Sequence, residues 1–181
     1  MPTIILHNYN PNEESLNAFN APHKYRFARK MKMDTSIFEM AWESGKIRVL
    51  SKLNLEIRKV IDTSQPFAFA FAPSNTRIFK DDIQSAIAVE FPNAIDFSEC
   101  FSKQNGFDAG VTTRVLTDDE LRKSIAINAG CFSEKLTTKI KQILLIDDVY
   151  SLGNTLNGME LVISDIEQTR EIFTIAILKT T

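Results

Sequence analysis

Short, continuous runs of apolar residues alternate along this chain with longer segments in which apolar residues recur every three or four positions. The continuous runs are typical of strands covered on both faces of a sheet, and we expect strands at 3–9, 67–72, 94–97, 143–146 and 170–178. The recurring spacing predicts amphipathic helices, at 37–43, 46–61, 80–91, 117–126 and from 156 onwards. The run 143–146 is the clearest, because four consecutive aliphatic residues fit the middle of a parallel sheet.

The first third of the chain carries weaker patterns. A short helix is expected to begin within 13–19, and the proline-containing segment 20–23 is expected to end it. Residues 24–33 alternate in part between basic and apolar side chains, which predicts a strand or edge segment with one solvated face. Gly45 is expected to separate the helices at 37–43 and 46–61.

The bulk composition is that of one globular domain of 181 residues, with 44% hydrophobic and 24% charged residues. A formal net charge of −2 gives no global field that would attract nucleic acid. The basic run at 24–32 is therefore interpreted as a solvated face. No apolar run reaches the roughly 18–20 residues of a membrane span, and the N-terminus lacks signal-peptide features. We expect a cytoplasmic protein without membrane partners.

The cysteines and histidines offer little for metal or nucleophilic chemistry. Cys100 and Cys131 lie far apart in the sequence and form no metal-ligand pair, so we expect reduced, buried thiols. His7 and His23 are the only histidines, which leaves no His-based metal site and no support for a nucleophilic triad. We therefore expect no metal site made of protein ligands.

The stretch from Ile143 to Thr155 carries the most specific chemistry. Asp147 and Asp148 follow the buried strand, and the polar segment 151–155 leads into the next helix. Backbone N–H groups at a helix N-terminus favour a phosphate, and carboxylates accept hydrogen bonds from sugar hydroxyls. A structural helix-capping turn is the less favoured alternative for two adjacent acids. This order of elements predicts a site for a ribose 5-phosphate.

This stretch resembles the signature by which type I phosphoribosyltransferases bind 5-phosphoribosyl 1-pyrophosphate (PRPP): four hydrophobic residues, two acidic residues and a Thr/Ser-x-Gly-x-Thr-like loop. The resemblance implies an α/β fold with a doubly wound, mainly parallel sheet. Residues 1–181 would form a single domain, with a small hood or appendage within 1–60. Asp147 and Asp148 would hold the ribose hydroxyls as the catalytic acid pair. The 5-phosphate would fall to the loop residues Ser151, Leu152, Gly153, Asn154 and Thr155.

The resemblance also implies where the pyrophosphate binds. In this family it is held by the loop after the first core strand, which corresponds here to Ser74, Asn75, Thr76 and Arg77. Ligands of open α/β sheets bind beyond the carboxyl ends of strands, and N–H groups, hydroxyls and a guanidinium suit a pyrophosphate. The weakly patterned span after residue 103 corresponds to the mobile loop that closes over PRPP. Its candidate contacts are Arg114, Arg122 and Lys123.

Three local features bear on the branch of the family, on the phosphate contact and on the acceptor. The runs 121–125 and 129–132 resemble in part the segment before the signature strand in the ComF-like branch, and Asp147-Asp148-Val149-Tyr150 is typical of that branch. Leu152 stands where Thr is usual, which removes a phosphate-binding hydroxyl worth roughly 1.5–3 kcal/mol to a charged group. Ser151 stands where purine-salvage members carry a base-contacting Asp, which argues against hypoxanthine or guanine as the acceptor.

The function that the resemblance implies is transfer of the 5-phosphoribosyl group from PRPP to an unidentified nucleophile, with release of pyrophosphate. Mg²⁺ would be bound mainly through PRPP. One alternative is a non-catalytic PRPP or nucleotide sensor on the same fold. Another is a ComF-like protein linked to DNA uptake through the 24–32 basic run, although nucleic acid is the less favoured partner. Many members of the family are dimers, so a homodimer is one expected assembly.

Overall fold

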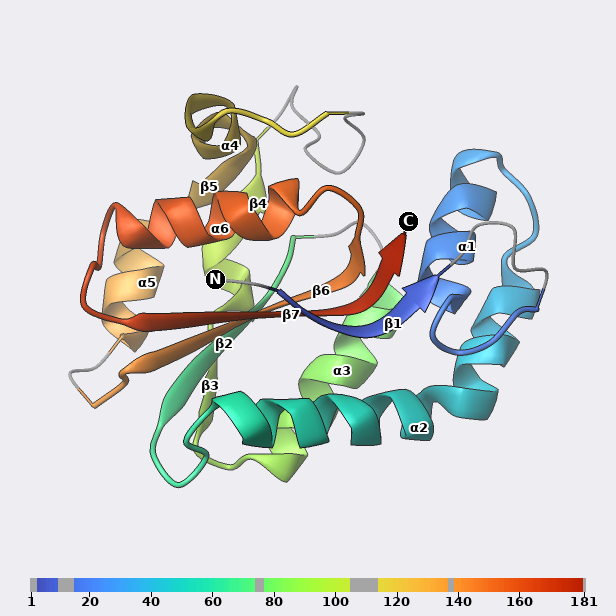
Figure 1. The fold of residues 1–181 in the computed structure, drawn as a ribbon, viewed down its shortest axis with the longest axis horizontal. Helices are drawn as coiled ribbons and strands as arrows, with labels where there is room; N and C mark the ends of the chain where they lie inside the picture. Colours follow the sequence, from blue (N-terminus) through green and yellow to red (C-terminus); the bar gives the residue numbers. More distant parts are fainter. Residues whose placement is uncertain (1–2, 10–14, 74–76, 105–113, 137–138, 181) are drawn as a thin grey trace.

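The main sheet has five strands, all parallel, in the order β1-β7-β6-β2-β3. A computed structural model describes residues 3–9, 15–73, 77–104, 114–136 and 139–180. The chain therefore has the α/β architecture with a parallel sheet that the sequence predicts (Figure 1). The strands of this sheet are β1 (Ile4–Tyr9), β2 (Phe67–Phe71), β3 (Ala94–Asp96), β6 (Gln142–Tyr150) and β7 (Glu171–Thr180).

Helices cover both faces of the sheet, and the two faces differ in the size of the side chains that they present. The phenylalanines of β2 (67, 69 and 71) belong to one core, and the alanines at 68, 70 and 72 belong to the other. Successive strand residues point to opposite faces, so this alternation separates a bulky face from a small one. The bulky face packs against α2 (Ser36–Val60) and α3 (Arg77–Glu90), and the small face against α5 (Ala129–Lys135) and α6 (Asn154–Ser164) (Figure 1).

The segment at 24–33 is helical, so the prediction of a strand there is wrong. Helix α1 spans Ala21–Lys30, with Pro22 in its first turn. Proline is tolerated there because the first N–H groups of a helix have no intrahelical partner. Pro22, Tyr25 and Ala28 are buried at helical spacing, a stripe that the surrounding cations obscure in the sequence. Residues 15–17 have no regular structure and 18–20 form turns, so the described part of 13–19 contains no helix.

Gly45 lies inside one continuous helix and does not end it. Helix α2 runs from Ser36 to Val60. A Cβ atom built on Gly45 would lie 2.7 Å from the Cβ of Ala18. The glycine therefore permits close approach of the chain around Ala18, which the local helix pattern does not reveal.

A second, two-stranded antiparallel sheet pairs β4 (Phe101–Lys103) with β5 (Ile125–Ile127). Between them in the sequence lies α4 (Asp118–Ser124), which begins with a capping box formed by Thr117 and Glu120. The antiparallel pairing brings residues on either side of this excursion together, as the hydrogen bond from Asn128 N–H to the Cys100 carbonyl shows at 2.8 Å.

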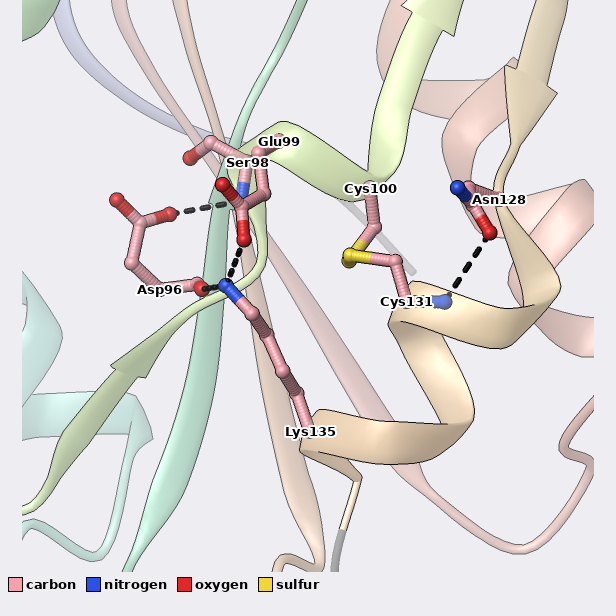
Figure 2. The surroundings of a disulfide bond; sticks show 7 residues. All are labelled: Asp96, Ser98, Glu99, Cys100, Asn128, Cys131 and Lys135. Carbon is pink, nitrogen blue, oxygen red and sulfur yellow. Dashed lines mark hydrogen bonds and ion pairs between the residues drawn. A yellow bond between two sulfur atoms is a disulfide. The ribbon is translucent and has the colours of Figure 1, made fainter.

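The same return of the chain joins Cys100 to Cys131 in a disulfide, so the expectation of two free thiols is wrong. The Cα atoms are 5.6 Å apart although the residues are 31 positions apart in the sequence. Cys100 ends the short 3₁₀ helix η1 (Ser98–Cys100), and Cys131 lies in the first turn of α5. Figure 2 shows the bond, with the Lys135 ammonium reaching from α5 to the Glu99 carboxylate and the Asp96 carbonyl. Disulfides are characteristic of oxidising compartments.

Within the described ranges, no helix combines the length and the apolar character that crossing a bilayer requires.

Candidate ligand site at the carboxyl ends of β2 and β6

The two central strands β2 and β6 lie side by side and are followed by connections to opposite sides of the sheet. The chain after β2 leads to β3 on one side, and the chain after β6 leads to β7 on the other. Open α/β sheets bind their ligands at such a switch point, beyond the carboxyl ends of the strands. The Ala72 N–H donates to the Ile146 carbonyl at 2.7 Å. The loop after β2 and the acid pair after Ile146 are therefore neighbours at the same edge of the sheet.

The loop that follows β2 is only partly described. Ser74, Asn75 and Thr76, which the family resemblance assigns to the pyrophosphate, lie outside the described residues. Arg77 begins α3, so its backbone opens the helix that follows the loop.

The acid pair is part of a strand that is longer than the sequence predicts. Strand β6 continues from the four-residue apolar run to Tyr150, and Asp147 is in register with Ala176 of β7. Asp147 and Asp148 are only 6% and 1% exposed. The two carboxylates nevertheless come close together, because Nη2 of one arginine, Arg26, lies near both.

Arg26 of α1 contacts both members of the pair. Its Nη2 donates to Asp148 Oδ1 and lies 3.9 Å from Asp147 Oδ1. Figure 1 shows α1 beside the carboxyl ends of β1 and β7. Sequence reasoning missed Arg26 because it is 122 positions from Asp148 and belongs to the basic run interpreted as a solvated face. The basic run itself was the available signal.

The second oxygen of Asp148 is a buried acceptor with no hydrogen-bond partner in the described structure. A buried polar atom without a partner costs free energy, about 1–3 kcal/mol and more for a charged group. An uncompensated carboxylate oxygen at a switch point is an acceptor suited to a hydroxyl or an amine of a ligand.

Burial and like charge set the protonation of this cluster. The pKa of Asp147 lies well above its ordinary value of 3.8 because burial disfavours the carboxylate, and the Asp148 charge adds to this, while Arg26 opposes it. The pKa of His23, which follows Pro22 in α1, is lowered from its ordinary value of 6.5 by burial and by the Arg26 charge, with Asp148 acting the other way. The His23 ring lies 5.5 Å from that of Tyr9. His23 is thus a neutral imidazole at neutral pH.

The loop between β6 and α6 has the backbone geometry of an anion site. Gly153 is the N-cap of α6 in the left-handed region, with φ of 75°, and as a glycine it makes no side-chain capping hydrogen bond. A Cβ on Gly153 would lie 2.5 Å from the Tyr150 hydroxyl, so only glycine fits beside that ring. The first N–H groups of α6 have no intrahelical acceptors. Ser151 is exposed, and Leu152 and Thr155 are half-buried.

The Asn154 side chain has a structural role in this loop. Its Oδ1 accepts from the Leu116 N–H at 3.1 Å, and its Nδ2 donates to the Arg114 carbonyl at 3.0 Å. Asn154 therefore fastens the segment before α4 to the start of α6. Its backbone N–H belongs to the first turn of α6, whose N–H groups are suited to bind an anion, whereas its side-chain amide is engaged by the backbone around residue 115.

The three basic residues assigned to the mobile loop lie in different places. The backbone carbonyl of Arg114 accepts a hydrogen bond from the Asn154 side chain at the N-terminus of α6. The Arg114 guanidinium pairs with the Glu120 carboxylate at 2.5 and 2.9 Å. Arg122 pairs with Asp165, the C-cap of α6, at 2.8 and 3.1 Å. At about 1.5 Å per residue, α6 with its 11 residues separates Arg122 from the loop by about 16 Å. Lys123 is exposed on α4. The structure does not bring Arg122 to the acid pair.

No protein-family model matches this chain, and no curated protein matches its sequence. Among the described residues, no three His, Cys, Asp or Glu side chains gather as metal ligands. The site is accordingly defined by its own geometry: two buried carboxylates, one arginine, and a helix start with glycine as its N-cap, at a switch point.

Proposed function

We propose that this chain is a phosphoribosyltransferase-like protein that binds PRPP and transfers its 5-phosphoribosyl group to a nucleophile, releasing pyrophosphate. One observation carries the proposal. The acid pair and the glycine-capped start of α6 stand together at the switch point between β2 and β6. Sugar hydroxyls and a phosphate, held by these two groups, are the chemistry of a ribose 5-phosphate. The parallel sheet with helices on both faces is compatible with the type I phosphoribosyltransferase fold.

The chemistry of this transfer depends mainly on positioning and charge. Breaking the bond between C1 and the pyrophosphate oxygen leaves the electron pair on pyrophosphate and gives the ribose oxocarbenium character. The nucleophile then donates a lone pair to C1. Asp147 and Asp148 orient the ring through its hydroxyls, and their negative charge favours the cationic ribose in the transition state.

The residues at the site also fit Mg²⁺ bound through PRPP. Hard cations prefer oxygen ligands and keep part of their water shell. The Asp148 oxygen that has no partner in the described structure can accept from such a water or from a ribose hydroxyl. Mg²⁺ would neutralise charge on the pyrophosphate, while the two aspartates bind the ribose hydroxyls of PRPP.

Ligand entry requires the Arg26 contact to open. Asp148 is 1% exposed, and Arg26 occupies its Oδ1. A ribose hydroxyl reaches this carboxylate only after the guanidinium has moved. The affinity for PRPP therefore includes the cost of parting Arg26 from the acid pair.

A binding protein without transferase activity is the second candidate function. Leu152 provides no hydroxyl for the phosphate, and Arg122 is held at the far end of α6. Both features lower the expected stabilisation of ligand and leaving group without removing the acid pair.

Measurement of pyrophosphate release separates these two functions. Wild-type protein is incubated with PRPP and Mg²⁺ and a panel of nucleobases and amines. The transferase proposal predicts pyrophosphate release that depends on one acceptor and is lost in Asp147→Asn/Asp148→Asn. Saturable PRPP binding with no release for any acceptor would support the sensor instead.

A further inference from the structure

The pyrophosphate that leaves C1 gains negative charge, and a cation beside it lowers the barrier. The family resemblance assigns this role to Arg77, whose side chain lies outside the described residues, and to Arg114, Arg122 and Lys123. In the structure the Arg114 guanidinium is engaged by Glu120 and the Arg122 guanidinium by Asp165. Within the described part of the chain, the guanidinium of Arg26 contacts the acid pair.

We propose that Arg26 is a catalytic residue that α1 supplies to the site, where its guanidinium binds the pyrophosphate of PRPP. This inference rests on the proposed function. In the structure, Arg26 is paired with Asp148 and close to Asp147. When PRPP binds, the ribose hydroxyls take the carboxylate oxygens, and the guanidinium turns to the phosphate oxygens.

The connectivity of PRPP places these groups within reach of one another. The pyrophosphate and the 2-hydroxyl are on adjacent ring carbons and on the same face of the ribose. A guanidinium in contact with Asp148 and 3.9 Å from Asp147 therefore stands next to the leaving group once the hydroxyls occupy the pair. Arginine presents donors in a planar fork that matches two phosphate oxygens.

The exchange of partners also preserves charge balance at a buried site. Without the ligand, Arg26 offsets the charge of two nearly inaccessible carboxylates. With the ligand, it offsets the pyrophosphate, while the carboxylates are compensated by hydroxyls and by the cationic character of C1. Arg26 transfers no proton; it stabilises the electron pair that remains on pyrophosphate when the C1–O bond breaks.

Binding of two ligands tests this assignment. PRPP and ribose 5-phosphate, which lacks the pyrophosphate, are titrated separately into wild-type protein, Arg26→Met and Lys30→Met. Lys30 is an exposed cation on the same helix and serves as a matched charge control. Arg26→Met is expected to weaken PRPP binding about 10- to 100-fold, the range for hydrogen bonds to a charged group. Ribose 5-phosphate should bind Arg26→Met at least as tightly as wild type, because its hydroxyls no longer displace the guanidinium from Asp148. Lys30→Met should match wild type for both ligands.

Three results would overturn the assignment. Equal loss of both ligands in Arg26→Met would show that Arg26 acts only through the acid pair. Tighter PRPP binding in this variant would show that Arg26 is merely an obstacle, and unchanged binding of both ligands would show a structural role. Wild-type protein that binds neither ligand would refute the proposed function itself.

The variant Arg26→Lys distinguishes a loss of binding from a loss of folding. Lysine keeps the charge over the acid pair but cannot bind two phosphate oxygens through a fork. PRPP affinity is expected between those of wild type and Arg26→Met, with the same thermal unfolding as wild type. Wild-type affinity in Arg26→Lys combined with full loss in Arg26→Met would restrict the role to charge.

Discussion

The guanidinium of Arg26 in α1 donates to the carboxylate of Asp148 in β6, across 122 positions of sequence. This contact joins the N-terminal helix to the carboxyl end of the central strand. It covers the most buried acid of the candidate site, because Asp148 is 1% exposed. The contact ties the stability of the fold to the accessibility of the site.

Removing the cation of this pair should destabilise the protein. Arg26→Met leaves a buried carboxylate without its partner, and breaking a buried pair costs about 3–5 kcal/mol. The lower end of that range is expected because the Arg26 side chain is 34% exposed. Chemical denaturation measures the change in the free energy of unfolding. Arg26→Met/Asp148→Asn should recover part of the loss, and two additive single losses would contradict the coupling.

The raised pKa of Asp147 predicts a pH dependence of stability. Asp147 binds its proton more tightly in the folded than in the unfolded protein. The free energy of unfolding therefore falls as the pH rises from the pKa of the unfolded state towards the pKa of the folded state. Wild type should therefore lose stability relative to Asp147→Asn as pH rises from near 3.8, and keep a constant difference above the folded pKa. Denaturant midpoints of the two proteins across this range give the comparison. If wild type instead gained stability relative to Asp147→Asn as the pH rises, the raised pKa of Asp147 would be contradicted.

The disulfide between Cys100 and Cys131 should stabilise the fold substantially. Closing a loop over a separation of 31 residues restricts the unfolded chain by about 3–4 kcal/mol in the loop-entropy account. Cys100→Ser/Cys131→Ser should lower the free energy of unfolding by that amount, and a reductant should do the same to wild type but not to the variant. Two thiols that react in unreduced, denatured wild-type protein would contradict the bond.

Gly153 should tolerate no side chain. Its positive φ is strained for L-residues, and an added Cβ meets the Tyr150 ring. Gly153→Ala is expected to cost about 1–3 kcal/mol of stability and to weaken phosphate binding at the α6 start. Gly130→Ala is the matched control, because the nearest atom to its new Cβ is at 3.4 Å, an ordinary contact. In a helix this change should be neutral or stabilising by up to about 1 kcal/mol. Equal effects of the two substitutions would contradict the geometry assigned to Gly153.

The sequence predicted those elements whose signal is local. The alternation of Phe and Ala in β2 and the aliphatic run of β6 define strands covered on both faces, and both are in the central sheet. The capping box at Thr117 was also readable, because its partners are three residues apart.

Features that depend on distant partners could not be read from the sequence in this way. The cations of α1 hide its short buried stripe, and nothing local indicates that Arg26 meets Asp148. The pairing of Cys100 with Cys131 depends on the antiparallel return of β4 and β5. In the sequence, Gly45 resembles the end of a helix, and its role in the close contact with Ala18 is evident only in the structure.

Calorimetric titration with PRPP and Mg²⁺ tests the central claim most directly. The site variant is Asp147→Asn/Asp148→Asn, and the control is Asp118→Asn/Asp119→Asn, an exposed pair of adjacent acids in α4. Saturable binding is expected for wild type and the control, with binding lost in the site variant although its circular dichroism matches wild type. Unchanged affinity in the folded site variant, or no binding to wild type, would contradict the account.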